Sequence, residues 1–138
     1  MTVLCFGTFD GLHPGHEDYF RQAKALGDRL VVVVARDETV QEVKRRAARF
    51  DQEARLQAVS SHPLVDQALL GLPGDKYEII EQIKPTVILL GYDQTTFTDR
   101  LTEELTARGL TVDMKRAEPY HPEIYKSSKL YARHQIHS

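Results

Sequence analysis

The sequence predicts an α/β fold: a single domain over residues 1–138, with a doubly wound, Rossmann-like sheet of five parallel strands and helices on both faces. Three observations predict it. Strand-like and helix-like segments alternate from one end of the chain to the other, which is typical of βαβ units. Several strand-like runs are apolar throughout, as strands covered on both faces are. The length of 138 residues suits one compact domain.

Five segments rich in aliphatic and β-branched residues are predicted as strands. The run "RLVVVVA" is typical of a central parallel strand, whereas "LTVDMK" alternates in polarity and is typical of an edge strand. The predicted strands cover residues 2–6, 29–35, 64–71, 86–91 and 110–115.

The segments between these strands carry helix signals. Pro14 suits the first position of a helix, Gly27 suits the C′ position after it, and Asp51 suits an N-cap. Asp75 and Glu78 have the spacing of a capping box. The predicted helices cover residues 13–26, 37–50 (as a helix or a helix followed by a loop), 51–61, 75–84, 98–108 and 127–135.

The composition is that of an ordinary soluble globular protein, with 41% hydrophobic and 28% charged residues. The net charge of -2 lacks the basic excess of nucleic-acid-binding domains, so any anion must be held by local groups. No membrane span or secretory leader is indicated, and we expect a cytoplasmic protein with neither nucleic acid nor membrane as partner. Cys5 is the single cysteine and is predicted as a buried strand residue.

Ligands of doubly wound sheets bind beyond the carboxyl ends of the strands, where the strand order reverses. The loops after the first and fourth predicted strands are therefore the expected site. They read "GTFDGLHPGH", residues 7–16, and "GYDQTT", residues 91–96.

The first of these loops combines glycines with two histidines at a predicted helix entrance. Gly7, Gly11 and Gly15 are four apart, which is not the dinucleotide spacing, but a strand, a glycine-bearing turn and a helix N-terminus still favour a bound anion. His13 would lie at the cap and His16 one turn in. Their N–H groups could donate to phosphoryl oxygens and stabilise the charge that grows as phosphorus is attacked.

Two other interpretations of the histidines compete with phosphate binding. A zinc site normally needs three or more protein ligands, and no cysteine or carboxylate set completes this pair, so no metal-ligating residue is predicted. In the other interpretation His13 only caps the helix and His16 only packs. The spacing leaves capping and phosphate binding open, and the position of the loop favours phosphate.

The stretch "GTFDGLHPGH" closely resembles the His-x-Gly-His signature of the nucleotidyltransferase superfamily that includes cytidylyltransferases and nucleotide-cofactor adenylyltransferases. "LGYDQ", residues 90–94, resembles the nucleotide-base loop of archaeal-type FAD synthases, and "YKSSKL", residues 125–130, resembles the second signature of the superfamily. The resemblance extends over nearly the whole chain. It implies an enzyme that transfers NMP from an NTP to a phosphorylated acceptor and releases pyrophosphate.

The resemblance also implies roles for residues of the first loop. His13 and His16 would contact the nucleotide phosphates and stabilise the transition state, without a covalent enzyme intermediate. Asp10 would hold the loop or the substrate, although it could equally be a turn-forming residue. The residues implied to bind nucleotide here are Gly7, Thr8, Phe9, Asp10 and Gly15.

Two further segments are implied to bind the nucleotide. Ser127 and Ser128 would offer hydroxyl and N–H groups to the β- and γ-phosphates, with Lys129 adding charge, or the serines would simply cap a helix. Lys126 stands where many relatives have a small hydroxyl residue. The residues implied to read the base are Gly91, Tyr92, Asp93 and Gln94.

A basic cluster follows the second predicted strand. In relatives a lysine in this region meets the triphosphate or the acceptor phosphate, which makes Lys44 a third candidate catalytic residue. Arg45, Arg46 and Arg49 could instead form a solvated helix face. Arg55 resembles a recurring arginine of the superfamily and is expected to pair with an acid.

The reaction that the resemblance favours is the adenylylation of FMN by ATP, which is the FAD synthase reaction. A CTP-dependent transferase acting on a small polyol or amino-alcohol phosphate, such as glycerol 3-phosphate, is the alternative. A non-catalytic nucleotide-binding protein is the alternative of another class. Mg²⁺ is the expected cofactor, held mainly by phosphates and water. Relatives are often dimers, so a homodimer is also implied.

Overall fold

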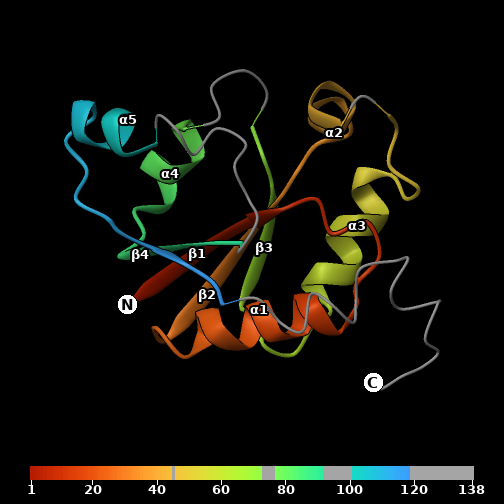
Figure 1. Ribbon diagram of the computed structural model, residues 1–138, viewed down its shortest axis with the longest axis horizontal. Coiled ribbons are helices and arrows are strands. Elements are labelled where there is room, and N and C mark those ends of the chain that lie inside the picture. Colours follow the sequence, from red (N-terminus) through yellow and green to blue (C-terminus); the bar gives the residue numbers. More distant parts are fainter. Residues whose placement is uncertain (45, 73–76, 92–100, 119–138) are drawn as a thin grey trace.

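The structure is a computed structural model, and it describes residues 1–44, 46–72, 77–91 and 101–118. Five parallel strands form one sheet in the order β3-β2-β1-β4-β5 (Figure 1). This confirms the predicted α/β class and its five-stranded parallel sheet. The strands are β1 (Thr2–Gly7), β2 (Arg29–Val34), β3 (Gln67–Leu70), β4 (Val87–Leu90) and β5 (Asp113–Arg116).

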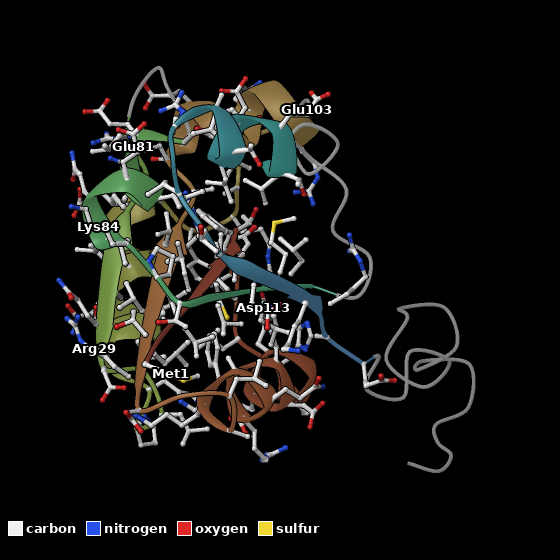
Figure 2. All side chains as sticks on the ribbon, turned by 90° about the vertical axis from the view of Figure 1, so that its left-hand side faces the viewer. Met1, Arg29, Glu81, Lys84, Glu103 and Asp113 are labelled. Carbon is white, nitrogen blue, oxygen red and sulfur yellow. The ribbon has the colours of Figure 1, made fainter. Side chains whose placement is uncertain are left out.

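Helices cover both faces of the sheet, as predicted. Figure 1 shows α1 on one side of the sheet and α4 and α5 on the other. Exposed charged side chains such as Arg29, Lys84 and Glu103 lie on the outside (Figure 2). The helices are α1 (Pro14–Lys24), α2 (Asp37–Lys44), α3 (Gln52–Ser60), α4 (Glu78–Ile83) and α5 (Leu101–Ala107). None of the described helices has the length and apolar character needed to cross a bilayer.

Strand β1 lies at the centre and supplies side chains to both halves of the core, because successive strand residues point to opposite faces. Val3 and Cys5 pack with residues of α1 and α3, whereas Leu4 and Phe6 pack with residues of α4 and α5. Cys5 is fully buried, and burial raises the pKa of its thiol to about 12 although a hydrogen bond with Tyr19 works to lower it.

The strand order reverses beside β1. The chain runs from β1 to β2 and then β3 in one direction, and β4 then pairs on the other side of β1. Gly7 ends β1 and Gly91 follows β4, so the two loops singled out from the sequence both leave this reversal at the carboxyl edge of the sheet. This is where ligands of such sheets bind.

Most of the local signals are confirmed. Pro14 begins α1, and the side chain of Asp51 caps α3 by accepting a hydrogen bond of 2.8 Å from the N–H group of Ala54. Gly109, with φ of 75°, follows α5. The polar segment 37–50 is a helix followed by a loop, and β5 is an edge strand. The helix predicted over residues 127–135 lies outside the described residues.

Two predicted helix signals are wrong. Tyr77 is the N-cap of α4 and makes no side-chain capping bond, so Glu78 is the first helical residue and cannot be the third residue of a capping box. The proposed partner of Glu78, Asp75, lies outside the described residues. Gly27 is not a C′ glycine either, because α1 is capped two residues earlier by Ala25 in a right-handed conformation.

Gly27 is needed instead for a close approach to the start of β1. A Cβ atom at position 27 would lie 2.7 Å from the carbonyl oxygen of Met1. That oxygen accepts hydrogen bonds from the N–H groups of Asp28 and Arg29, at 3.0 and 3.2 Å. Met1 and Arg29 accordingly lie at the same end of the sheet (Figure 2).

We expect Gly27→Ala to lower the free energy of unfolding by about 1–3 kcal/mol, because the added methyl group pushes Met1, which precedes β1, away from the turn before β2. Gly71→Ala is the matched control, since its nearest neighbours would lie 3.7 and 3.8 Å from the new Cβ. Urea unfolding of both variants measures the difference. Equal stability of the two would show that the contact with Met1 imposes no constraint.

Candidate active site

The loop between β1 and α1 is built on a buried aromatic ring. Phe9 is 3% exposed and has φ of 55°, an unusual conformation for a bulky residue. Its ring lies over Gly7, where a Cβ atom would be only 2.5 Å from Phe9 Cζ. The ring also packs edge-on against His16, with centroids 5.2 Å apart. Phe9 can therefore line a phosphate turn only with its backbone, since its ring belongs to the core.

The two histidines cap α1 reciprocally. His13 Nδ1 accepts a hydrogen bond of 3.0 Å from the N–H group of Gly15, and His16 Nδ1 accepts one of 3.3 Å from the N–H group of His13. The rings stack, with centroids 3.9 Å apart and planes inclined by 27°. Gly15 permits this geometry because a Cβ atom there would lie 2.8 Å from His13 Cε1.

These hydrogen bonds fix which ring nitrogen carries the proton. Since Nδ1 is the acceptor in both histidines, the network assigns the proton of each neutral ring to Nε2. Burial lowers the pKa of His13 below its ordinary value, which favours the neutral ring at pH 7. Capping and phosphate binding are therefore compatible, because Nδ1 accepts the capping hydrogen bond, whereas Nε2–H is the group that could donate to a phosphate.

Asp10 ties this loop to the segment between α2 and α3. Its two carboxylate oxygens accept hydrogen bonds of 2.8 and 2.9 Å from the N–H groups of Arg49 and Phe50. Burial works to raise the pKa of Asp10, but these two bonds and the charges of Arg49 and Arg55 outweigh it and hold the pKa below its ordinary value. In this geometry Asp10 holds the loop, which is one of the roles that the sequence left open for it.

Arg55 is a buried charge that joins four segments at the carboxyl edge. It is 1% exposed, and its guanidinium donates to the carbonyl oxygens of Thr8, Ala35 and Phe50 at 2.7 to 3.0 Å. It also donates to Asp37 Oδ1 at 2.7 Å, and this bond is the main reason that the pKa of Asp37 is lowered. The predicted pairing of Arg55 with an acid is confirmed.

Tyr19 links α1 to β4 beside the point where the strand order reverses. Its hydroxyl group donates a hydrogen bond of 2.6 Å to the carbonyl oxygen of Leu89, which fixes α1 to β4. Burial raises the pKa of this hydroxyl group, so Tyr19 stays protonated. Directly after β4, the carbonyl oxygen of Gly91 accepts a hydrogen bond of 2.7 Å from Arg116 of β5.

A family model described as "Cytidylyltransferase-like" matches residues 4–133, which is nearly the whole chain. The chain belongs to the cytidylyltransferase-like family. The resemblance drawn from the two signatures is thereby confirmed, and the protein is an enzyme of the nucleotidyltransferase type.

Curated relatives of this cytidylyltransferase-like chain include proteins named FAD synthase. One from Aciduliprofundum boonei is 42% identical over 120 residues, covering 87% of this chain and 80% of the relative. One from Thermoplasma volcanium is 39% identical over 130 residues, covering 94% of this chain and 91% of the relative.

Among solved structures, a Thermoplasma volcanium GSS1 protein described as a lipopolysaccharide core biosynthesis protein superposes with a TM-score of 0.82. It is 40% identical and the match covers 87% of this chain and 98% of that protein. An Archaeoglobus fulgidus protein of unknown function has a TM-score of 0.70 at 16% identity, over 86% of this chain and 90% of that protein, and shows the shared fold alone.

The described part of this cytidylyltransferase-like chain brings together the first loop, the end of β4 and the segment around Arg49. Lys44 is the last residue of α2, but its side chain lies outside what is described. Arg46 is exposed, and Arg49 contacts Asp10. The predicted residues outside the described ranges are Arg45, Tyr92, Asp93, Gln94, Lys126, Ser127, Ser128 and Lys129.

Reasoning from the sequence did not identify two side chains at the carboxyl edge of the sheet. Arg36 follows β2, and its Nε atom donates a hydrogen bond of 2.6 Å to the carbonyl oxygen of Gly71 after β3. Phe50 is 45% exposed and lies beside the first loop. The available signal for Phe50 was a lone aromatic residue in a polar segment, between Arg49 and the N-cap Asp51.

We expect Asp10→Asn to destabilise the fold at neutral pH, because it removes the charge that accepts two backbone N–H groups. The pKa of Asp10 is lowered in the folded chain, so its contribution is complete above the unfolded value of about 3.9 and is lost as pH falls through the folded value. The stability difference between wild type and variant should therefore narrow below about pH 4. Urea unfolding across pH 3 to 7 measures it, and a difference that stays constant with pH would contradict this role.

Proposed function

We propose that this chain is an FMN adenylyltransferase, which joins FMN and ATP to give FAD and pyrophosphate. The observation that carries the proposal is the pair of stacked imidazoles at the start of α1, each oriented by a backbone N–H group that donates to its Nδ1. The relatives named FAD synthase, at 39 to 46% identity, support this acceptor and this nucleotide.

In this reaction an oxygen of the FMN phosphate attacks the α-phosphorus of ATP. The bond from that phosphorus to the oxygen bridging to the β-phosphate breaks, and pyrophosphate leaves. Negative charge grows on the oxygens of the α-phosphoryl group as this happens. Two Nε2–H donors and the positive end of the α1 dipole can stabilise this charge without forming any covalent bond to the enzyme.

The remaining contacts around the loop hold these donors in place. Gly15 lets the His13 ring fold over the start of α1, while Asp10 and Arg55 fasten the loop to its neighbours. Positioning of this kind is the main contribution that a protein makes to phosphoryl transfer.

Mg²⁺ is proposed to accompany the triphosphate rather than to occupy a cage of side chains. No group of three or more histidine, cysteine or acidic residues could hold a metal ion in the part of the chain that is described. Asp10, the carboxylate of the loop, already accepts two backbone N–H groups. Such a donor set fits an ion whose ligands are mainly phosphate oxygens and water. When bound, the ion neutralises and orients the triphosphate.

The other roles carried over from the family are part of the same proposal. Lys44 would meet a phosphate of one of the substrates, and Ser127, Ser128 and Lys129 would bind the β- and γ-phosphates. The base of the nucleotide would be read by residues 91–94. A homodimer is also proposed, on family resemblance alone.

The imidazole donors are tested by variants that keep the cap of α1. Serine is a good N-cap whose hydroxyl group is too short to replace an imidazole Nε2–H, so His13→Ser keeps the cap while removing one donor. His16→Ala removes the other donor and costs only the longer capping bond of 3.3 Å. Each should slow FAD formation by about a hundredfold or more. Chromatography of FAD and a pyrophosphate-release assay measure the loss, and circular dichroism checks the fold.

His62→Asn is the matched control, because His62 packs against Phe20, and Asn can keep the hydrogen bond that its Nδ1 accepts from Leu64. This variant should leave the rate of FAD formation within a few fold of wild type.

The wild-type assay pairs each of four NTPs with FMN, glycerol 3-phosphate and choline phosphate. Turnover with CTP and a polyol phosphate would establish the cytidylyltransferase alternative. Tight nucleotide binding without turnover of any pair would establish a non-catalytic binding protein.

Removal of divalent ions separates a nucleotide-borne metal from a structural one. EDTA should abolish FAD formation and added Mg²⁺ should restore it, while the melting temperature without nucleotide stays unchanged. A melting temperature that falls in EDTA would show that the protein itself holds an ion.

A further inference from the structure

Phe50 is an exposed aromatic side chain at the edge of the sheet where the first loop lies. Met1 and Phe50 are the exposed large hydrophobic side chains of the described residues, and Met1 lies at the opposite, amino end of β1. The ring of Phe50 lies 3.7 Å from the position that a Cβ atom of Gly11 would occupy. The ring therefore stands directly beside the loop that carries His13 and His16.

The backbone of Phe50 is held on both sides by hydrogen bonds. The N–H group of Phe50 donates to Asp10 Oδ1 at 2.9 Å, and its carbonyl oxygen accepts a hydrogen bond of 3.0 Å from Arg55 Nε. The guanidinium of Arg49 lies 5.4 Å from the ring centroid and donates to the carbonyl oxygen of Asp10 at 2.8 Å. Because the backbone of Phe50 is fixed in this way, a ligand that stacks on the ring has only the side-chain torsions of this residue left to order.

The position of the ring relative to the strands indicates which substrate it meets. Arg55 bonds both Phe50 and Ala35, which follows β2, so the ring lies on the β2 side of β1. Gly91, the start of the proposed base loop, follows β4 on the other side of β1. If the nucleotide base binds over β4 and the phosphates bind at His13 and His16, the second substrate binds on the β2 side of β1.

We infer that Phe50, together with the Arg49 guanidinium, is a stacking platform for the planar isoalloxazine ring of FMN. This inference rests on the proposed function and names the contact that selects the acceptor. A flat aromatic ring gains from stacking on an aromatic face and from a neighbouring guanidinium. Glycerol 3-phosphate has no ring and gains nothing there, so the platform favours a flavin over a polyol phosphate.

Kinetic variants test the platform. Phe50→Ala should raise KM for FMN about tenfold and leave KM for ATP within about twofold, because stacking is lost on the acceptor side only. Phe50→Tyr keeps an aromatic face and should restore KM for FMN. Thermal unfolding of each variant identifies any loss of fold. If KM for both substrates rises equally, or Phe50→Tyr fails to rescue, the inference is wrong.

The chain contains no tryptophan, which allows a direct test of contact. An indole quenches the fluorescence of a flavin by electron transfer, which needs near contact. FMN emission should fall further on binding to Phe50→Trp than on binding to wild type. Thr111→Trp is the control, because position 111 is exposed and precedes β5. FMN emission should fall no further with this control than with wild type.

The outcomes separate this inference from the proposed function. If wild type forms no FAD from FMN and ATP, the proposed function fails, and the quenching experiment still decides the platform because it needs no turnover. If wild type forms FAD while Phe50→Ala keeps its KM for FMN and Phe50→Trp quenches no more than Thr111→Trp, the function stands and the platform is wrong.

Discussion

The carboxyl edge of the sheet depends on the hydrogen bonds of one buried guanidinium. Arg55 is 1% exposed and bonds the carbonyl oxygens of Thr8, Ala35 and Phe50 as well as the carboxylate of Asp37. A buried charge is tolerated only when its donors are satisfied, so these acceptors and the arginine require one another. Through this single group, the end of β1, the end of β2, the start of α2 and the segment before α3 have one fixed arrangement.

The geometry of the histidine loop follows from that arrangement. Asp10 bonds the same segment that Arg55 bonds, so the loop is held at Thr8 and at Asp10 before α1 begins. The two imidazoles then use Nδ1 to satisfy N–H groups that a helix N-terminus leaves open. Donors that are already oriented need little reorganisation when charge develops on a phosphoryl group. A chain with a net charge of -2 can in this way bind a polyanion with local groups.

The sequence alone predicted well the order of strands and helices along the chain, because this order follows from local periodicity. The continuous apolar run of β2, the alternation in β5 and the N-cap at Asp51 are all short-range signals. Three features that the sequence did not show have a common physical cause. Gly27 contacts Met1, Asp10 bonds a segment 39 residues away, and Phe50 is significant only because that segment returns to the loop. Such contacts are produced by tertiary packing, and no spacing within the sequence encodes them.

The single thiol of the chain has a practical consequence. Cys5 is in the middle of the central strand, is fully buried and has a pKa raised to about 12. Alkylating reagents attack thiolates, so they can modify this side chain only after β1 has separated from its neighbours. The rate at which a maleimide or iodoacetamide consumes the protein therefore counts global opening events, and no engineered label is required to follow them.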